Sequence, residues 1–333
     1  MDTPRAGIRN DWRREGKTMT TVRNRTVLIT GAGGGLGRRL ARSFARRGAY
    51  VVASDVRLAD ARRTADELTG CGWAAEAAEL NVADEASIRR VRDALDRAGR
   101  RVEILVNNAG LVFGGAFGDV PLERHCRTLE VNALGPVRVT HVFWPHLTAA
   151  DEGHVVNIAS ASAMIGLPFA TTYAASKWAV LGFSESLRDE LHAAGCRSVH
   201  VTAVCPGYIA TGMFDGVRPP LLMPWLKPGP LAEAIVRAVQ RNRDIVRTPW
   251  IVKLIPFGRG TMHRKLFRAL LRLLRVPQSM VSWRGHAAAA QELCAAPHPQ
   301  PSAAGSTTRQ RSTPAKALLP PPSSGALPVP ENA

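Results

Sequence analysis

A glycine-rich turn between a short apolar strand and a helix limits the folds open to this chain more than any other feature. Residues 26–30 are β-branched or aliphatic and predict a buried strand, and a helix is expected over about 38–47. Between them, residues 31–37 contain five glycines, which permit a tight turn. The N–H groups and dipole at the start of such a helix favour an anion. The pattern therefore predicts a strand–turn–helix unit that holds the pyrophosphate of a nucleotide.

Strands and helices continue to alternate along the next 200 residues. Further strands are expected at 50–54, 76–80, 104–106, 154–159, 199–204 and 245–246. The helices between them are expected at 59–68, 84–98, 122–147, from about 173 to 193, and at 231–242. Such alternation predicts an α/β fold, a single Rossmann-type doubly wound parallel sheet with helices on both faces.

Polar residues and turn residues recur where the expected strands end. Asp55, Asn81, Asn107, Ser160 and Pro206 all fall at the carboxyl ends of expected strands. In parallel sheets, ligands bind outside the carboxyl ends of the strands. These positions therefore predict one site at one edge of the sheet.

Asp55 indicates which nucleotide this site prefers. It follows Gly37 by 18 residues, where a carboxylate accepts both ribose hydroxyls and repels a 2′-phosphate. This favours NAD(H). Arg57 and the pair Arg38–Arg39 could accommodate that phosphate instead, so NADP(H) remains open.

Tyr173 and Lys177 are four residues apart on an expected helix and therefore share a face. A nearby ammonium favours the phenolate and lowers the pKa of a tyrosine. The pair is therefore a candidate for acid–base chemistry near neutral pH.

Residues 23–250 resemble the short-chain dehydrogenase/reductase family, with Thr30, the glycine turn, Asn107–Gly110 and Pro206–Thr211 at the positions of its motifs. Its catalytic tetrad is matched by Asn132, Ser160, Tyr173 and Lys177. Its cofactor-binding positions are matched by Gly31, Gly33, Gly35, Leu36, Gly37, Asp55, Asn81, Val82, Asn108, Ala109, Gly110, Tyr173, Lys177, Pro206, Gly207, Ile209 and Thr211. Asn81 departs from the usual aspartate, although its amide can still accept a hydrogen bond from adenine. Ser162 is a less favoured alternative to Ser160.

The resemblance implies a role for each tetrad member. Tyr173 would exchange a proton with the substrate, and Lys177 would lower its pKa and hold the nicotinamide ribose. Ser160 would donate a hydrogen bond to the substrate oxygen, and Asn132 would anchor a water through its main-chain geometry. Thr211 would bind the carboxamide of the nicotinamide.

Two segments beyond residue 211 bear on the substrate and on partners. The apolar run 219–226 lies where the family has its substrate lid, which predicts a hydrophobic substrate. In 262–275, Arg264, Arg268, Arg272 and Arg275 share one face, opposite a face of Leu266, Phe267, Leu270, Leu273 and Leu274. Such a helix suits an anionic membrane surface, or packing on the substrate mouth or a second subunit. Residues 251–285 also look similar to the tails of retinol- and hydroxysteroid-dehydrogenase-like proteins.

The net charge, the cysteines and the terminal segments bear on the partners and the location of the protein. The net charge of +17 points to an anionic partner, and the absence of a nucleic-acid-binding motif disfavours nucleic acid. Five scattered cysteines predict a reducing, cytoplasmic location without structural zinc, with peripheral membrane contact through 262–275 left open. Residues 1–22 and 286–333 are expected to be disordered, and polar residues within 155–176 exclude a membrane span there.

Three functions remain open from the sequence. The first is an NAD(P)-dependent dehydrogenase or ketone reductase for an apolar alcohol, such as a retinoid, steroid or long-chain compound. The second is an NADPH-dependent reductase of acyl or polyketide carbonyls on a carrier protein. The third is a membrane-associated nucleotide-binding protein without turnover. The family resemblance also implies a dimer or tetramer formed through the helices that carry Asn132 and Tyr173.

Overall fold

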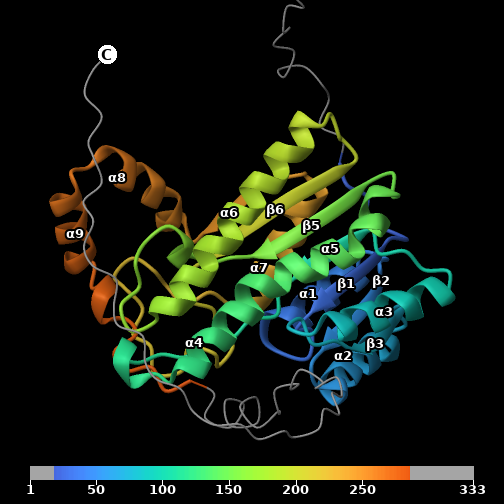
Figure 1. Cartoon of the computed structure of the whole chain (residues 1–333), viewed down its shortest axis with the longest axis horizontal. Helices are drawn as coiled ribbons and strands as arrows, with labels where there is room; N and C mark the ends of the chain where they lie inside the picture. Colours follow the sequence, from blue (N-terminus) through green and yellow to red (C-terminus); the bar gives the residue numbers. More distant parts are fainter. Residues whose placement is uncertain (1–18, 286–333) are drawn as a thin grey trace, which may run out of the picture.

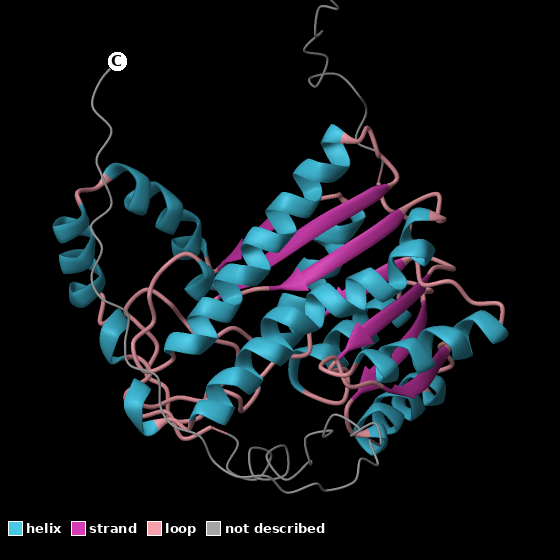
Figure 2. Ribbon diagram, in the orientation of Figure 1, coloured by secondary structure: helices cyan, strands magenta, loops and turns pink. Residues whose placement is uncertain are grey.

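The computed structural model describes residues 19–285, and they build one parallel sheet of seven strands (Figures 1 and 2). The strand order is β3-β2-β1-β4-β5-β6-β7, and every neighbouring pair is parallel. The strands are β1 (Thr26–Thr30), β2 (Tyr50–Asp55), β3 (Ala75–Glu79), β4 (Ile104–Asn107), β5 (Gly153–Ile158), β6 (Val199–Pro206) and β7 (Ile245–Thr248). The predicted fold class is confirmed.

Helices cover both faces of the sheet (Figure 1). They are α1 (Gly35–Ala45), α2 (Leu58–Gly70), α3 (Glu85–Arg97), α4 (Leu122–Leu129), α5 (Gly135–Thr148), α6 (Thr171–Ala193), α7 (Pro228–Gln240), α8 (Ile255–Thr261) and α9 (Arg264–Leu273). Phe44 of α1 and Ile235 of α7 are fully buried in the core on one face, and Ile88 of α3 and Phe143 of α5 in the core on the other. Because strand side chains alternate between the faces, β1 places Ile29 in the first core and Leu28 in the second.

The helix expected over 122–147 is interrupted. A π-helical turn, Glu130–Leu134, separates α4 from α5 and carries Asn132. Pro136 follows this turn and has no backbone N–H, so it cannot make the regular helical hydrogen bond. The interruption reorients Asn132 relative to a straight helix, and such turns are frequent at functional sites.

The helix expected over 262–275 ends sooner than predicted. A separate helix, α8, precedes it, and α9 ends at Leu273. Arg275 has a φ of 60°, in the left-handed region, and therefore does not belong to the arginine face of α9. Phe267, Leu271 and Leu274 pack against the core, which leaves the apolar face predicted for α9 only partly exposed.

The start of the chain also differs from the expected arm. Thr20 and Val22 are buried, and the Thr20 hydroxyl donates a 2.5 Å hydrogen bond to Asn242 Oδ1. Residues 19–22 therefore pack on the domain. The rest of the expected arm and the expected tail, 286–333, lie outside the described residues. No helix within 19–285 has the length and apolar character needed to cross a membrane.

Candidate active site

The glycine turn joins β1 to α1 and brings backbone very close to backbone. Gly31 and Gly35 have φ values of 65° and 52°, which side-chain-bearing residues rarely adopt. A Cβ placed on Gly37 would lie 2.1 Å from the carbonyl oxygen of Gly31. At Gly34, by contrast, a Cβ would meet no protein atom within 4 Å. The turn is thus tight on its inner side and open on the side where a phosphate would approach the start of α1.

Asp55, at the end of β2, faces this turn. Its Oδ2 accepts a hydrogen bond from the Gly33 N–H at 3.0 Å, and its Oδ1 accepts one from the Arg57 N–H at 3.1 Å. Each carboxylate oxygen has further acceptor capacity, so the ribose hydroxyls can still bind. Arg57 Nε lies 2.5 Å from Asp60 Oδ2, an ion pair that holds this guanidinium at the entrance.

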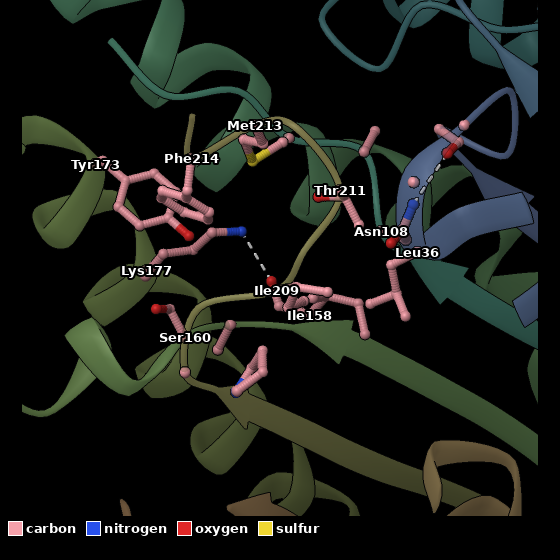
Figure 3. A pocket seen from close by; sticks show the side chains of 18 of the residues that line it. Leu36, Asn108, Ile158, Ser160, Tyr173, Lys177, Ile209, Thr211, Met213 and Phe214 are labelled. Atoms are coloured by element: carbon pink, nitrogen blue, oxygen red, sulfur yellow. Dashed lines mark hydrogen bonds between the residues drawn. The ribbon is translucent and has the colours of Figure 1, made fainter. Parts of the chain in front are cut away.

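Two asparagines after β4 fix the neighbouring strand ends. Asn108 Nδ2 donates to the carbonyl oxygen of Thr30 at 2.9 Å and to that of Gly31 at 3.1 Å. Figure 3 shows the bond to Gly31. Asn107 Nδ2 donates to Asn157 Oδ1 of β5 and to Thr140 Oγ1 of α5. These side-chain hydrogen bonds stabilise the ends of the neighbouring strands and the turns that follow them.

Ser160, Tyr173 and Lys177 converge on one space (Figure 3). Ser160 follows β5, and its Oγ accepts a hydrogen bond from the Ser162 N–H at 3.1 Å. Tyr173 and Lys177 lie in the first two turns of α6 and are both buried. The Lys177 ammonium donates to the Ile158 carbonyl at 2.8 Å and lies 5.7 Å from the centre of the Tyr173 ring.

Asn132 lies behind Lys177 rather than in the cavity. Its Oδ1 accepts from the Leu111 N–H and its Nδ2 donates to the Leu111 carbonyl, both at 2.8 Å. A Cβ placed on Gly110 would lie 3.3 Å from Asn132 Oδ1 and 3.6 Å from Lys177 Nζ, so both side chains flank this glycine. The π-helical turn directs Asn132 to this position.

Burial has the largest effect on the acid–base behaviour of the pair. It raises the pKa of Tyr173 above its usual range, and the Ser160 hydroxyl acts in the opposite direction. It lowers the pKa of Lys177 to about 8. The pKa of Tyr173 is therefore raised by burial, and is not lowered as its spacing to Lys177 predicts. A raised pKa favours the neutral phenol, which can donate its proton.

A cavity of about 260 Å³ runs from the glycine turn to Tyr173. Of the predicted residues, it is lined by Gly31, Gly35, Leu36, Asp55, Asn108, Ala109, Gly110, Ser160, Tyr173, Lys177, Pro206, Gly207, Ile209 and Thr211. A neighbouring cavity of about 150 Å³ adds Asn81 and Val82, together with Asp55. Gly33, Gly37 and Asn132 line neither cavity. An elongated site that has an acid at one end and an open glycine turn in the middle fits a dinucleotide.

Beside Ser160 and Tyr173 lies a second, narrow chamber of about 30 Å³. Its walls are mostly apolar and include Leu167, Phe214, Pro220, Met223 and Val276. Ser162 also lines it, and the buried Ser162 hydroxyl has no hydrogen-bond partner within the described residues. Besides Ser160, Tyr173 and Tyr208, this chamber therefore offers the Ser162 hydroxyl to an otherwise apolar ligand.

The sequence did not predict that residues 276–285 return to pack beside this chamber, where Val276 lines it. Tyr208 hydroxyl donates to Ser279 Oγ at 2.9 Å, and Trp283 Nε1 donates to the Met213 carbonyl at 3.1 Å. Trp283 also fits against Gly114, where a Cβ would lie 2.7 Å from the indole. The sequence signals there were an isolated tryptophan close to the end of an amphipathic segment and the similarity of this segment to the tails of retinol- and hydroxysteroid-dehydrogenase-like proteins. Residues 19–285 hold no cluster of His, Cys, Asp or Glu side chains placed to bind a metal ion.

Comparison with known proteins decides the family. The family model described as short chain dehydrogenase matches residues 25–221. The chain belongs to the short-chain dehydrogenase family. Human epidermal retinol dehydrogenase 2 is 35% identical over 258 residues, covering 75% of this chain and 82% of the relative. Rat estradiol 17-beta-dehydrogenase 11 is 31% identical over 264 residues, covering 78% and 87%.

A solved structure supports the same assignment. The structure of a short-chain dehydrogenase/reductase from Burkholderia phymatum in complex with NAD superposes with a TM-score of 0.66 at 27% identity, covering 73% of this chain and 95% of that one. The resemblance inferred from the sequence is thereby confirmed. The protein is an NAD(P)-dependent oxidoreductase of this family, whose relatives interconvert alcohols and carbonyl compounds.

Proposed function

We propose that this protein interconverts a hydrophobic primary or secondary alcohol and its carbonyl compound. One observation supports the proposal most strongly. Ser160, Tyr173 and Lys177 line the elongated cavity that fits a dinucleotide, and Ser160 and Tyr173 also line the apolar chamber beside it. A substrate whose reacting carbon lies beside Tyr173 would extend its apolar part into that chamber. The names of the two relatives, a retinol and an estradiol dehydrogenase, support an apolar substrate.

Each side chain has a role that its surroundings suit. Tyr173 exchanges a proton with the substrate oxygen, and its neutral state favours donation to a carbonyl. Ser160 donates a hydrogen bond to the same oxygen as charge develops there. Lys177, held by Ile158, favours the phenolate when the proton must be accepted. The bound nicotinamide supplies hydride transfer.

Asn132 and the strand-end residues position these groups. Asn132 fixes the loop at Leu111 and lies next to Lys177 across Gly110. Ile209 and Thr211 close over the glycine turn, where the Thr211 side chain lies beside Gly35. Asn81 and Val82 would contact the adenine end. The residues present fit NAD(P), and Asp55 at the ribose position favours NAD(H) over NADP(H).

The direct test is turnover. Purified protein is assayed with NAD⁺ and with NADP⁺ against all-trans-retinol, a 17β-hydroxysteroid and a C12–C16 alcohol series, with Tyr173→Phe as the matched control. We expect oxidation of at least one apolar alcohol, reduced about 10³-fold or more by the substitution. Full activity in the Tyr173→Phe protein, or turnover of short polar alcohols alone, would refute the proposal.

A second candidate is reduction of acyl groups on an acidic carrier protein. The strongly basic segment around α8 and α9, which lacks Asp and Glu from residue 245 to 285, favours it. Asp55 disfavours an NADPH-dependent reductase of this kind, because a carboxylate at the ribose position repels a 2′-phosphate. Preference for NADPH with an acyl-carrier substrate would establish this alternative. A folded protein that binds NAD(H) and turns over neither class would instead be a nucleotide-binding protein without catalysis.

Two surfaces suggest partners in a reducing cytoplasm. Exposed apolar side chains on α4, the π-helical turn and α5 (Leu122, Leu129, Leu134 and Val137) suit the helix-mediated dimer or tetramer expected for the family. The exposed side chains of Trp250, Leu254 and Phe257 recur on one face before and within α8, and Leu266 and Leu273 of α9 are also exposed. These five exposed apolar side chains suit peripheral contact with an anionic bilayer. The leucine face predicted from the sequence suits it less well, because part of that face packs against the core. Light scattering and vesicle flotation, respectively, test the two surfaces.

A further inference from the structure

A groove of about 1010 Å³ lies between the first turns of α6 and helix α9, beside the carboxyl ends of the strands (Figure 1). Leu167, Phe267 and Leu271 contribute an apolar floor. The charged side chains that line the groove are all basic, namely Arg259, Arg264, Arg268 and Arg272. The groove therefore combines an apolar surface with concentrated positive charge.

The four guanidinium groups differ in what holds them. Arg259 Nη1 donates to the Met164 carbonyl at 3.0 Å, and this guanidinium lies 4.2 Å from the centre of the Trp178 ring. The other three form no ion pair with any acidic side chain in residues 19–285 (Arg264, Arg268 and Arg272). Since residues 245–285 contain no Asp or Glu, their charge is not neutralised locally. An anion in the groove would meet one guanidinium that is held in place, that of Arg259, and three that have no acidic partner among the described residues.

The geometry of α9 separates these arginines from the exposed leucines. At about 100° per residue, Arg264, Arg268 and Arg272 fall within about 80° of one another. Leu266 and Leu273 fall on the opposite side of the helix and are exposed, at 58% and 72%. The arginines thus face the groove and not the apolar surface proposed to meet a bilayer. The positive charge of these arginines is therefore placed to attract an anionic ligand into the groove.

The groove adjoins the chamber beside the catalytic residues. Ile165, Leu167 and Val276 line both spaces. The chamber also contacts Ser160 and Tyr173, so these three apolar side chains are the boundary between the reacting groups and the arginines. Small rotations of these side chains would open a narrow apolar path, which admits an unbranched chain more readily than a fused ring system.

We propose that the groove binds the carboxylate head of a single-chain anionic amphiphile, which is the substrate of this enzyme. Its apolar chain crosses Ile165, Leu167 and Val276, and the hydroxyl or carbonyl at its far end lies at Tyr173. This inference rests on the proposed function and narrows its substrate class. The reaction is unchanged: the hydroxyl proton passes to the phenolate form of Tyr173, which Lys177 favours, and bound NAD(P)⁺ would accept the hydride from the carbinol carbon.

Binding is tested first, and it needs no turnover. Dodecanoate is titrated by calorimetry into wild-type protein, into the double variant Arg268→Gln/Arg272→Gln, and into the control Arg237→Gln, which removes an exposed charge from α7. Charge-assisted hydrogen bonds contribute enough that the double variant should bind about 10- to 100-fold more weakly. The control should match the wild type, and unchanged NADH binding verifies that each variant is folded. Equal affinity for all three proteins would overturn the inference.

The dependence of kcat/KM on substrate chain length then tests how far the carboxylate of the substrate lies from its reacting hydroxyl. For ω-hydroxy acids of 8 to 18 carbons, kcat/KM should peak at one chain length, because the carboxylate fixes the distance to Tyr173. Neutral 1-alkanols should show no such peak, and the double variant should lose it. A monotonic rise for both series, driven by hydrophobicity alone, would contradict the inference.

The two proposals fail separately. Arginine-dependent dodecanoate binding without oxidation of any alcohol would support the groove and overturn the proposed function. Oxidation of retinol or alkanols with no preference for a carboxylate would support the function and overturn the groove. If the arginine variants lose vesicle binding but keep dodecanoate affinity, the arginines act at a membrane and the inference is wrong.

Discussion

The cofactor side and the substrate side of the site are built in different ways. The cofactor side consists of the turns after β1, β2 and β4, where backbone atoms and short polar side chains fix one another. The substrate side consists of residues 160–168, 207–226 and 276–285, which are far apart in sequence and meet through apolar packing. The residues proposed to bind the cofactor are thus fixed by local backbone geometry, whereas the residues proposed to bind the substrate are fixed by long-range side-chain contacts.

The largest effect is expected from Gly37→Ala on the cofactor side. The new Cβ would lie 2.1 Å from the Gly31 carbonyl oxygen, so the backbone must shift. We expect loss of folded protein or a destabilisation of about 3 kcal/mol or more, measured by denaturant unfolding. The matched variant Gly34→Ala, with no protein atom near its Cβ, should unfold like wild type. Similar stability for the two variants would contradict the backbone account.

A smaller loss is expected from Trp283→Ala on the substrate side. The indole hydrogen-bonds the Met213 carbonyl and fills the space beside Gly114. Its removal should cost about 1–3 kcal/mol in unfolding free energy and raise KM for apolar alcohols. NADH affinity should stay within about twofold of wild type. A parallel loss of NADH binding would show that the two sides are not independent.

Lys177→Met is expected to stabilise the protein while abolishing activity. Burial lowers the pKa of Lys177 to about 8, below its unfolded value, so the folded state at pH 7 carries a charge that burial disfavours. As pH rises from about 8 to about 10.5, the folded protein releases this proton before the unfolded chain does, and wild-type stability increases. The variant should be more stable at pH 7 by about 1–2 kcal/mol, partly offset by the unpaired Ile158 carbonyl, and the gain should vanish near pH 10.5. A variant less stable than wild type at pH 7 would contradict this expectation.

The smallest effect on stability is expected from Ser162→Ala. The Ser162 hydroxyl is buried without a partner, so its loss should change the unfolding free energy by less than about 1 kcal/mol. Because it faces the chamber, KM should change selectively for substrates that carry a second polar group. If KM is altered equally for all alcohols, Ser162 acts on the shape of the chamber and not as a hydrogen-bond partner.

The same contrast explains what could be predicted from sequence. The sheet, the glycine turn and the polar residues at strand ends depend on local patterns and on the rule for parallel sheets, and the structure brings them together as expected. The π-helical turn at Asn132, the ending of α9 before Arg275 and the return of Trp283 depend on tertiary contacts. That burial raises the pKa of Tyr173 could likewise not be judged from its spacing to Lys177.

Cofactor titration tests the central claim, a dinucleotide site with its specificity set at Asp55, most directly. NADH and NADPH are titrated by fluorescence into wild-type protein and Asp55→Ala. We predict tighter binding of NADH by the wild type, with that preference reduced or lost in the variant, because the carboxylate that faces the ribose is removed. Tighter binding of NADPH by the wild type would mean that Arg57 or the Arg38–Arg39 pair determines the preference, and absence of binding of either would contradict the account of the site.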